Sequence, residues 1–560
     1  MTNPSFPQWT TKITEGKDVL GEDMLGLEGA AQGFQQWLIP GIISTTDHAR
    51  YYSFYAWVLY RYINSLSSNR TLDGFKKGFH KRHEMALILG SYSHHINRTP
   101  IAGLTGAGRN HLKASSWWNA SDSISLNINY LNKKEKIGGL KQYLSPMQAM
   151  GIIGEQEYSS WIYPLTHRGE ALAQAYTDSI SKTTYYKNLE EEGELGDLSH
   201  KDAINFGKKG CICAEALSEG ADLELLRDAF FRFDQHGEDN PHFRRRLALA
   251  VTLDLVRGAK GKFESNMLRP AMYLGEYYPN IKYQPSPELE DWAFRWKMVT
   301  VRHHYTFGLQ TLWGAFILQL RESKEGISLS EFMAWAKKTI DANIFDASLE
   351  GYLNSVCESV GLSPKWQKSH KDFEDACLQK TEVDEYSIFL YANRNPNDPE
   401  VLLTVGLQTL ISHYLRSLHF HQSPRPEWNE MADRERLSIT SFYNFMGENL
   451  SAGSSLGSWL EKLYKEFILS QHEFIALGKL RYQKYDTFKF HYRDGRFYWP
   501  FRRADHWREP IRLAGNRLER ALSILLDLNL VEENEDRQYS LTKDGKKYLE
   551  RVLEMRRHDN

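Results

Sequence analysis

Apolar residues recur along most of this chain at steps of three and four, the period of an amphipathic helix. The clearest run comprises Phe294, Met298, Val301, Tyr305, Leu309, Leu312, Phe316 and Leu320. An aromatic run of Tyr51, Phe54, Val58 and Tyr62 predicts a buried helix over residues 47–63, with Arg50 and Arg61 kept in solvent. The pattern predicts a mainly α protein.

Two stretches depart from this pattern, and they resemble each other. Each has a short apolar helix, a strand, a polar loop, a second strand and another helix, over residues 138–176 and 516–552. Leu541-Thr542-Lys543-Asp544-Gly545 repeats Leu165-Thr166-His167-Arg168-Gly169, and five apolar positions of the preceding helix match at one constant offset. Because chance would have to produce the pattern twice, the repeat predicts the same fold, with a two-stranded wing, in both segments.

This pattern resembles the winged-helix family of DNA-binding domains. Its members often show a helix ending in Leu-x-x-Leu-Gly-Leu-Ile, then a wing, then Leu-Thr-x-x-Gly. The resemblance implies a multidomain helical protein with two winged-helix (α+β) modules, which serve in DNA binding or in protein docking. Pro146 lies inside the first helix, where it removes a backbone donor, and this argues against groove insertion by the first copy.

The length of 560 residues indicates several domains. We expect an N-terminal helical region over 1–137, a winged-helix-like module over 138–182, a helical domain over 203–445, and a basic hairpin with a second winged helix over 446–560. The acidic stretch Glu190-Glu191-Glu192-Gly193-Glu194 has no apolar period, so we expect residues 183–202 to form a linker.

Composition limits the cellular setting. Only four cysteines occur, which is too few for disulfides to stabilise a chain of this size and fits a reducing compartment. The N-terminus lacks a basic region followed by an apolar one, and no apolar run reaches the roughly 18 residues that span a bilayer. We therefore expect a cytoplasmic protein that makes no membrane contact.

The net charge is only −2, so any nucleic-acid surface must be local. Residues 479–520 hold 12 Lys or Arg against five Asp or Glu. Asp494-Gly495 predicts a tight hairpin whose alternation would place Phe488, Phe490 and Tyr492 on one face and basic residues on the other. Double-stranded DNA is the expected partner, contacted by Lys489, Arg493, Arg496, Arg502, Arg503, Asn516, Arg517 and Arg520.

Catalytic and metal-binding motifs are weak in this sequence. Cys211 and Cys213 lack the paired spacing of a zinc ribbon or finger, and the adjacent His94 and His95 should point to different faces of a helix. Neither a Walker motif nor a Gly-x-Ser-x-Gly elbow occurs. We therefore expect neither a cofactor nor a metal ion, and the sequence establishes no enzymatic activity.

The N-terminal half is weakly similar to uncharacterised bacterial proteins. The similarity rests on Leu38-Ile39-Pro40-Gly41, Ala49-Arg50-Tyr51-Tyr52 with Trp57, residues 222–231 and Arg244-Arg245-Arg246. Such families often lie beside mobile-element or phage-defence genes. The leading hypothesis is a non-catalytic DNA-binding or DNA-sensing subunit of a bacterial multi-component system such as anti-phage defence, with protein partners. An adaptor that bridges ATPase subunits through winged-helix docking, and a nuclease without a recognisable motif, remain alternatives.

Overall fold

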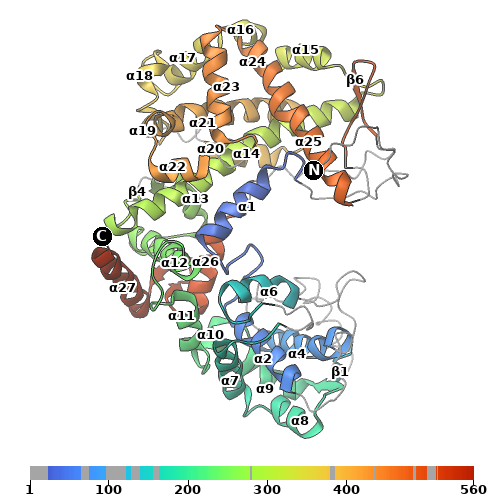
Figure 1. The fold of residues 1–560 in the computed structure, drawn as a ribbon, viewed down its shortest axis with the longest axis vertical. Coiled ribbons are helices and arrows are strands. Elements are labelled where there is room, and N and C mark those ends of the chain that lie inside the picture. Colours follow the sequence, from blue (N-terminus) through green and yellow to red (C-terminus); the bar gives the residue numbers. More distant parts are fainter. Residues whose placement is uncertain are drawn as a thin grey trace, which may run out of the picture. The chain divides into compact units, whose positions relative to one another are not determined.

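The computed structural model describes residues 23–64, 75–95, 122–127, 139–155, 163–277, 281–378, 385–432, 436–483, 487–500, 513 and 515–559. Figure 1 shows that helices dominate this part of the chain, which confirms the mainly α prediction. Its strands form two-stranded sheets: β1 (Ser123–Ser125) with β2 (Asp197–Ser199), β3 (Glu276–Tyr277) with β4 (Ile281–Lys282), β5 (His491–Arg493) with β6 (Arg496–Tyr498), and β7 (Val531–Glu533) with β8 (Tyr539–Leu541). No helix among the described residues combines the length and the apolar character needed to cross a membrane.

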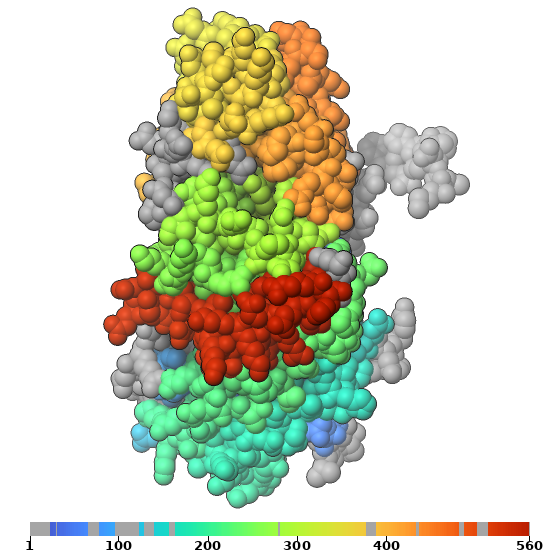
Figure 2. Space-filling view, turned by 90° about the vertical axis from the view of Figure 1, so that its left-hand side faces the viewer, coloured from blue at the N-terminus to red at the C-terminus, as the bar shows by residue number. Residues whose placement is uncertain are grey.

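The chain divides into two compact units, and both are discontinuous in sequence. Unit 1 contains residues 1–34, 272–276 and 294–514, whereas unit 2 contains residues 35–271, 277–293 and 515–560. Each unit therefore draws on several of the regions expected from the sequence. The C-terminal segment, drawn in red in Figure 2, belongs to unit 2 and lies at the surface in that view.

Unit 1 is built around α14 (Glu290–Glu322), from Phe294 onward, and α21 (Pro399–Gln422). The predicted apolar run of α14 is buried, and Gly308 and Gly406 let the two helices approach closely. Ser328 and Glu331 form a capping box at α15, where the two side chains satisfy the helix's first backbone donors. Among the described residues, unit 1 also contains the α-helices α15 (Leu329–Ile340), α16 (Ala342–Asp346), α17 (Leu349–Ser359), α18 (Trp366–Ser369), α19 (Phe373–Leu378), α20 (Glu385–Arg394), α22 (Pro426–Ala432), α23 (Ile439–Ser451), α24 (Leu456–Leu463) and α25 (Ser470–Gln483).

Unit 2 holds two tightly packed helix pairs, α2 (Arg50–Asn64) with α7 (His167–Ile180) and α4 (His80–His94) with α9 (His200–Gly210). The aromatic stripe of α2 is buried as predicted. Arg50, which we expected in solvent, is fully buried, because it pairs with a carboxylate inside the unit. The described residues of this unit also form the α-helices α6 (Leu140–Ala149), α8 (Thr184–Glu192), α10 (Ala214–Ser218), α11 (Leu223–Phe231), α12 (Pro241–Gly258), α26 (Arg517–Asp527) and α27 (Lys543–Asp559); α1 (Leu27–Leu38) and α13 (Leu268–Leu274) have residues in both units.

The expected linker over residues 183–202 is instead regular structure. Thr183 caps α8 by accepting from the Tyr186 N–H, and Tyr185 and Leu189 are buried four residues apart on one face of this helix. After α8 the chain enters β2, which pairs with β1. The acidic residues occupy the exposed face of α8, so their charge does not prevent it from folding.

The two repeated segments share one backbone framework. In the second copy, α26, β7, β8 and α27 follow in the predicted order. Thr542 donates to the Asn529 carbonyl and accepts from the Gly545 N–H, just as Thr166 donates to the Gly151 carbonyl and accepts from the Gly169 N–H. The hydrogen-bond pattern therefore follows the sequence register.

The first copy differs in its wing. Its helices α6 and α7 flank one antiparallel bridge between Ile153 and Leu165, and residues 156–162 of the predicted wing lie outside the described residues. Gly151 and its counterpart Asn529 both adopt a left-handed backbone, with φ of 66° and 56°. Glycine and asparagine tolerate this conformation best, which explains both residue choices at the same turn.

Candidate metal centre

A close helix crossing in unit 2 sets up the candidate site. A side chain at Gly207 on α9 would place its Cβ 2.1 Å from the carbonyl oxygen of Gly90 on α4, so only glycine permits this approach. His94 lies four residues after Gly90, and Cys211 lies four residues after Gly207. Because four residues make about one helical turn, the two helices bring His94 and Cys211 together one turn beyond their crossing.

Both histidines face the site because α4 ends between them. His94 is the last residue of α4, and His95 is its C-cap, with φ −106° and ψ 9°. The His95 N–H bonds to the carbonyls of Ser91 and Tyr92. The expectation that the two rings point to different faces of a helix is therefore wrong, since His95 has left helical geometry.

Both cysteines lie in the turn between α9 and α10. Cys211 is the C-cap of α9, and Cys213 is the N-cap of α10, where its sulfur accepts from the Ala216 N–H at 3.5 Å. Ile212, between them, is fully buried and anchors the turn in the core. The end of a helix thus fixes the backbone of each cysteine.

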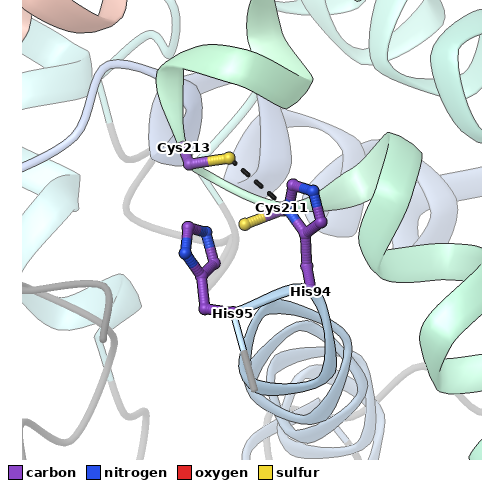
Figure 3. Close-up of side chains that lie close together, drawn as sticks. All are labelled: His94, His95, Cys211 and Cys213. Carbon is purple, nitrogen blue, oxygen red and sulfur yellow. Dashed lines mark hydrogen bonds between the residues drawn. The ribbon is translucent and has the colours of Figure 1, made fainter. Parts of the chain in front are cut away.

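Four side chains converge here, two from the end of α4 and two from the turn between α9 and α10. One ligand atom from each of His94, His95, Cys211 and Cys213 lies within 4.8 Å of the other three, and Figure 3 shows both rings directed from the end of α4 toward the two sulfurs. Cys213 Sγ lies 3.6 Å from His94 Nδ1. Bond lengths of roughly 2.3 Å to sulfur and about 2.0 Å to nitrogen place a sulfur and a nitrogen about 3.6 Å apart around a tetrahedral zinc ion. The separation between Cys213 Sγ and His94 Nδ1 therefore matches that of two ligands on one zinc ion.

The two thiols have opposite electrostatic surroundings. The Cys211 thiol donates toward Cys213 and lowers the pKa of Cys213 strongly, and His94 acts in the same direction. Burial raises the pKa of Cys211. Burial likewise raises the pKa of Cys357, an isolated thiol on α17, to about 11. Cys213 is therefore the cysteine that carries the thiolate first, and a thiolate is the form that binds metal.

The imidazoles are also suited to act as ligands. His94 presents Nδ1 to Cys213, while its Nε2 lies 4.0 Å from a carboxylate oxygen of Glu215. A carboxylate on the far side of a ligating ring stabilises the matching tautomer. His95 Nε2 is buried and has no hydrogen-bond partner among the described residues, which is costly for a polar atom unless something binds it.

An open cavity borders the cluster. It has a volume of about 340 Å³ and is lined by Ser93, His94, Ile204, Lys208, Lys209, Glu215, Ala216 and Glu219. Lys209 and Glu219 pair across it at 2.6 Å. Because His94 forms part of its wall, the cavity reaches one edge of the cluster.

Several of the residues expected to contact DNA are buried or paired with other residues of the protein. The Asn516 side chain caps α26 by accepting from the Leu518 N–H. Arg517 is 4% exposed and donates to the Ile42 carbonyl, and burial lowers its pKa to about 10. Arg520 pairs with Asp47. Asn516 and Arg517, expected on the outward face of this helix, are therefore buried, and Arg520 is partly exposed.

The hairpin in unit 1 also differs from expectation. The turn Asp494-Gly495 forms as predicted between β5 and β6. Lys489, expected on a basic face, is buried, whereas Tyr492, expected in the core, is 61% exposed. The regular strand begins only at His491, and the Lys489 N–H bonds to buried His472, so strand alternation does not extend back to Lys489.

The remaining arginines of the expected set divide into three cases. Arg496 pairs with Glu331 and donates to the Gly326 carbonyl. The Arg493 side chain is 80% exposed and lies beside Asp494. Arg502 and Arg503 lie outside the described residues. Of the eight expected residues, only Arg493 is described as largely open to solvent.

Comparison with known proteins gives no match: no family model, curated protein or solved structure matches this chain. Function must be argued from the site itself. Sequence reasoning missed this group of four side chains because its two halves lie far apart along the chain. The available signal was Gly90 and Gly207, each placed four residues before a potential metal ligand.

Proposed function

We propose that this protein binds one Zn²⁺ ion through His94, His95, Cys211 and Cys213. The convergence of all four ligand atoms within 4.8 Å carries this proposal. Two thiolates balance the charge of a divalent cation, and two neutral imidazoles complete a tetrahedral set, so the bound ion adds no net charge to a largely buried place. A two-iron cluster of this composition would hold its histidines and its cysteines on different irons, which suits the single compact group less well.

The proposed ion has a structural role. Four protein ligands leave no open position for water or substrate, as in structural zinc sites, whereas catalytic zinc keeps one position free. The ion would cross-link the end of α4 to the turn between α9 and α10. Nothing in this role requires a catalytic step.

Metal content of the purified full chain tests this proposal. We expect one zinc per chain by mass spectrometry of the metal, and visible absorption typical of tetrahedral thiolate coordination when Co²⁺ replaces zinc. Cys211→Ser, Cys213→Ser, His94→Ala and His95→Ala should each lose zinc. Cys357→Ser and His167→Ala are matched controls, because Cys357 is buried on another helix and the His167 side chain is fully exposed.

Two results would contradict the zinc assignment. One is a reduced wild-type chain that takes up neither Zn²⁺ nor Co²⁺. The other is loss of metal in the control variants to the same extent as in the four ligand variants, which would show that binding does not depend on the cluster.

A second candidate function is DNA binding, and we propose it for the tip of the β5–β6 hairpin. All three residues of β5, His491, Tyr492 and Arg493, are exposed, which places an aromatic ring and a cation together at a hairpin tip. Exposed Arg and Tyr side chains suit phosphate contacts and base stacking. The winged-helix resemblance supports the same partner. In α26, however, Arg517 and Arg520 already contact Ile42 and Asp47 of unit 2.

Fluorescence anisotropy of duplex DNA with the full chain tests this second proposal. Arg493→Ala should weaken binding and reduce the slope of log K against log salt by about 0.9, the value for one phosphate contact. Arg394→Ala, which removes an exposed arginine from α20, is the control and should leave the slope unchanged. Equal slopes for the wild type and Arg493→Ala would exclude the hairpin as the contact.

A further inference from the structure

A buried polar network surrounds the turn that carries the two cysteines. Arg50, at the start of α2, donates from Nη1 to the carbonyl oxygen of Cys211 at 2.9 Å. Its Nε and Nη2 donate to the two carboxylate oxygens of Asp222 at 3.2 and 3.1 Å. Both side chains are fully buried. One guanidinium therefore joins a proposed metal ligand to a buried carboxylate.

The carboxylate is itself held in place. Ser179 on α7 donates to Asp222 Oδ1 at 3.1 Å and accepts from the Ala221 N–H at 2.9 Å. A side chain at Gly220 would place its Cβ 2.5 Å from Asp222 Oδ1 and 2.8 Å from Arg50 Nη2, so the backbone passes close to the pair. Asp222 thus has little freedom to turn away from Arg50.

A second hydrogen bond holds the same turn. The Tyr176 hydroxyl donates to the Gly210 carbonyl at 2.9 Å, and the Arg50 guanidinium lies over the Tyr176 ring, 5.3 Å from its centre. Tyr176 on α7 therefore binds the Gly210 carbonyl, and Arg50 on α2 binds the next carbonyl, that of Cys211. These contacts involve no metal ligand atom, so they define the course of the turn before any ion binds.

The chemistry of the guanidinium explains why arginine occupies this position. Its planar fork offers five donors, enough to bind a carboxylate with two of them and a carbonyl with a third. A lysine presents a compact charge and cannot reproduce this geometry. Burying the pair is costly unless its hydrogen bonds are satisfied, so the network remains in place only when Cys211 is correctly oriented.

We propose that Arg50 is a positioning residue of the metal site, which it preorganises by fixing the backbone at Cys211 so that both thiols face the two imidazoles. This inference rests on the proposed zinc binding. Partners that orient metal ligands typically contribute about 10-fold to 100-fold to metal affinity. Arg50 should therefore act on affinity without contacting the ion.

Competition between the full-length chain and a chromophoric chelator for Zn²⁺ measures this effect. Arg50→Lys should bind zinc about 10-fold to 100-fold more weakly than the wild type. Tyr176→Phe removes one hydroxyl and keeps the ring, so it should fold and show a smaller decrease in the same direction. It serves as the test if Arg50→Lys does not fold.

Arg245→Lys is the matched control for general destabilisation. Arg245 is also a buried arginine of unit 2, and its guanidinium donates to the Ala229, Phe230 and Pro40 carbonyls. We expect this variant to unfold at lower temperature with unchanged zinc affinity. Unchanged affinity in Arg50→Lys and Tyr176→Phe, or an equal loss in folded Arg245→Lys, would overturn the inference. A wild type that binds no zinc would instead overturn the proposed function.

Discussion

The two repeated segments of unit 2 dock on the same helix with opposite charges. Arg168 in the first copy and Asp544 in the second occupy equivalent positions of the repeat. Arg168 lies 3.7 Å from Asp228, whereas Asp544 lies 3.1 Å from Arg227, and these two partners are neighbours on α11. The two segments thus have the same backbone arrangement. Their contacts with α11 differ in that the first segment contributes the positive partner, Arg168, and the second the negative partner, Asp544.

The second copy is also held by buried polar contacts with the rest of unit 2. Arg227 is 4% exposed, and it donates to the carbonyls of Leu528 and Asn529 as well as pairing with Asp544. Asp527, at the end of α26, accepts from the Ala49 N–H and pairs with His48. Asp527 and Asp544 of the C-terminal copy therefore attach it to the rest of unit 2.

The largest expected effect tests the shared framework. A Cβ at Gly545 would lie 1.8 Å from the Leu530 carbonyl oxygen, and a Cβ at Gly169 would lie 2.2 Å from that of Ile152. Because each clash is with backbone, neither can be relieved by a side-chain rotation. Gly545→Ala and Gly169→Ala should each lower the free energy of unfolding by about 3 kcal/mol or more, measured by chemical denaturation.

Gly447→Ala provides the control for these glycine variants. Gly447 is in α23, where a Cβ meets nothing within 4 Å, so alanine should be neutral or stabilise by up to about 1 kcal/mol. If only one of the two clashing variants is destabilised, the two copies do not share the framework.

The next effect tests the difference in attachment. Arg227→Ala should lower the free energy of unfolding by about 2 kcal/mol, because it leaves the Leu528 carbonyl without its buried donor. Arg168→Ala should cost only about 0.5 kcal/mol, since its partner Asp228 is more than half exposed. Equal losses in thermal denaturation would show that the two contacts do not differ.

Removal of the metal should affect the local stability of the two repeated segments to different extents. Cys213 begins α10, and α10 packs against α26 of the second copy. Chelation should therefore reduce amide protection more in α26 than in α6, as measured by hydrogen exchange. Because the crossing of α4 and α9 does not need the ion, both helices should remain folded, and a global loss of helicity on chelation would contradict this.

The smallest effect concerns pH and the first copy. His242 lies beside Gly151 and accepts a hydrogen bond from Arg245 at 2.8 Å, which requires a neutral ring. Burial, followed by the nearby Arg245, lowers the pKa of His242 to about 3 from its ordinary value of 6.5. Between these values the unfolded chain binds more protons than the folded chain, so stability falls as the pH falls from 6.5 toward 3.

His242→Gln isolates this contribution, since glutamine can accept the same hydrogen bond without titrating. The variant should lose less stability than the wild type between pH 6.5 and 3, as measured by denaturant unfolding at several pH values. Parallel pH profiles for the two proteins would exclude His242 as a contributor.

The sequence by itself determined the local structure of this protein. Steps of three and four defined α2 and α14, Asp494-Gly495 defined the β5–β6 turn, and the two Leu-Thr-x-x-Gly elements located the repeat. These features depend on residues close together in the chain, whose spacing fixes which face is buried. The same reasoning failed at Arg50 and Lys489, where the burial of a charge depends on partners far away in sequence.

Only the tertiary structure decided the candidate metal site. Neither His94-His95 nor Cys211-x-Cys213 has the spacing of a known zinc motif, because each supplies half of the ligand set from the end of a different helix. The two halves meet because Gly90 and Gly207 allow α4 and α9 to cross at backbone distance, and only the tertiary structure shows that these two glycines face each other. The basic count over residues 479–520 did not show that Lys489 and Arg517 are buried, since packing rather than composition determines which charges reach solvent.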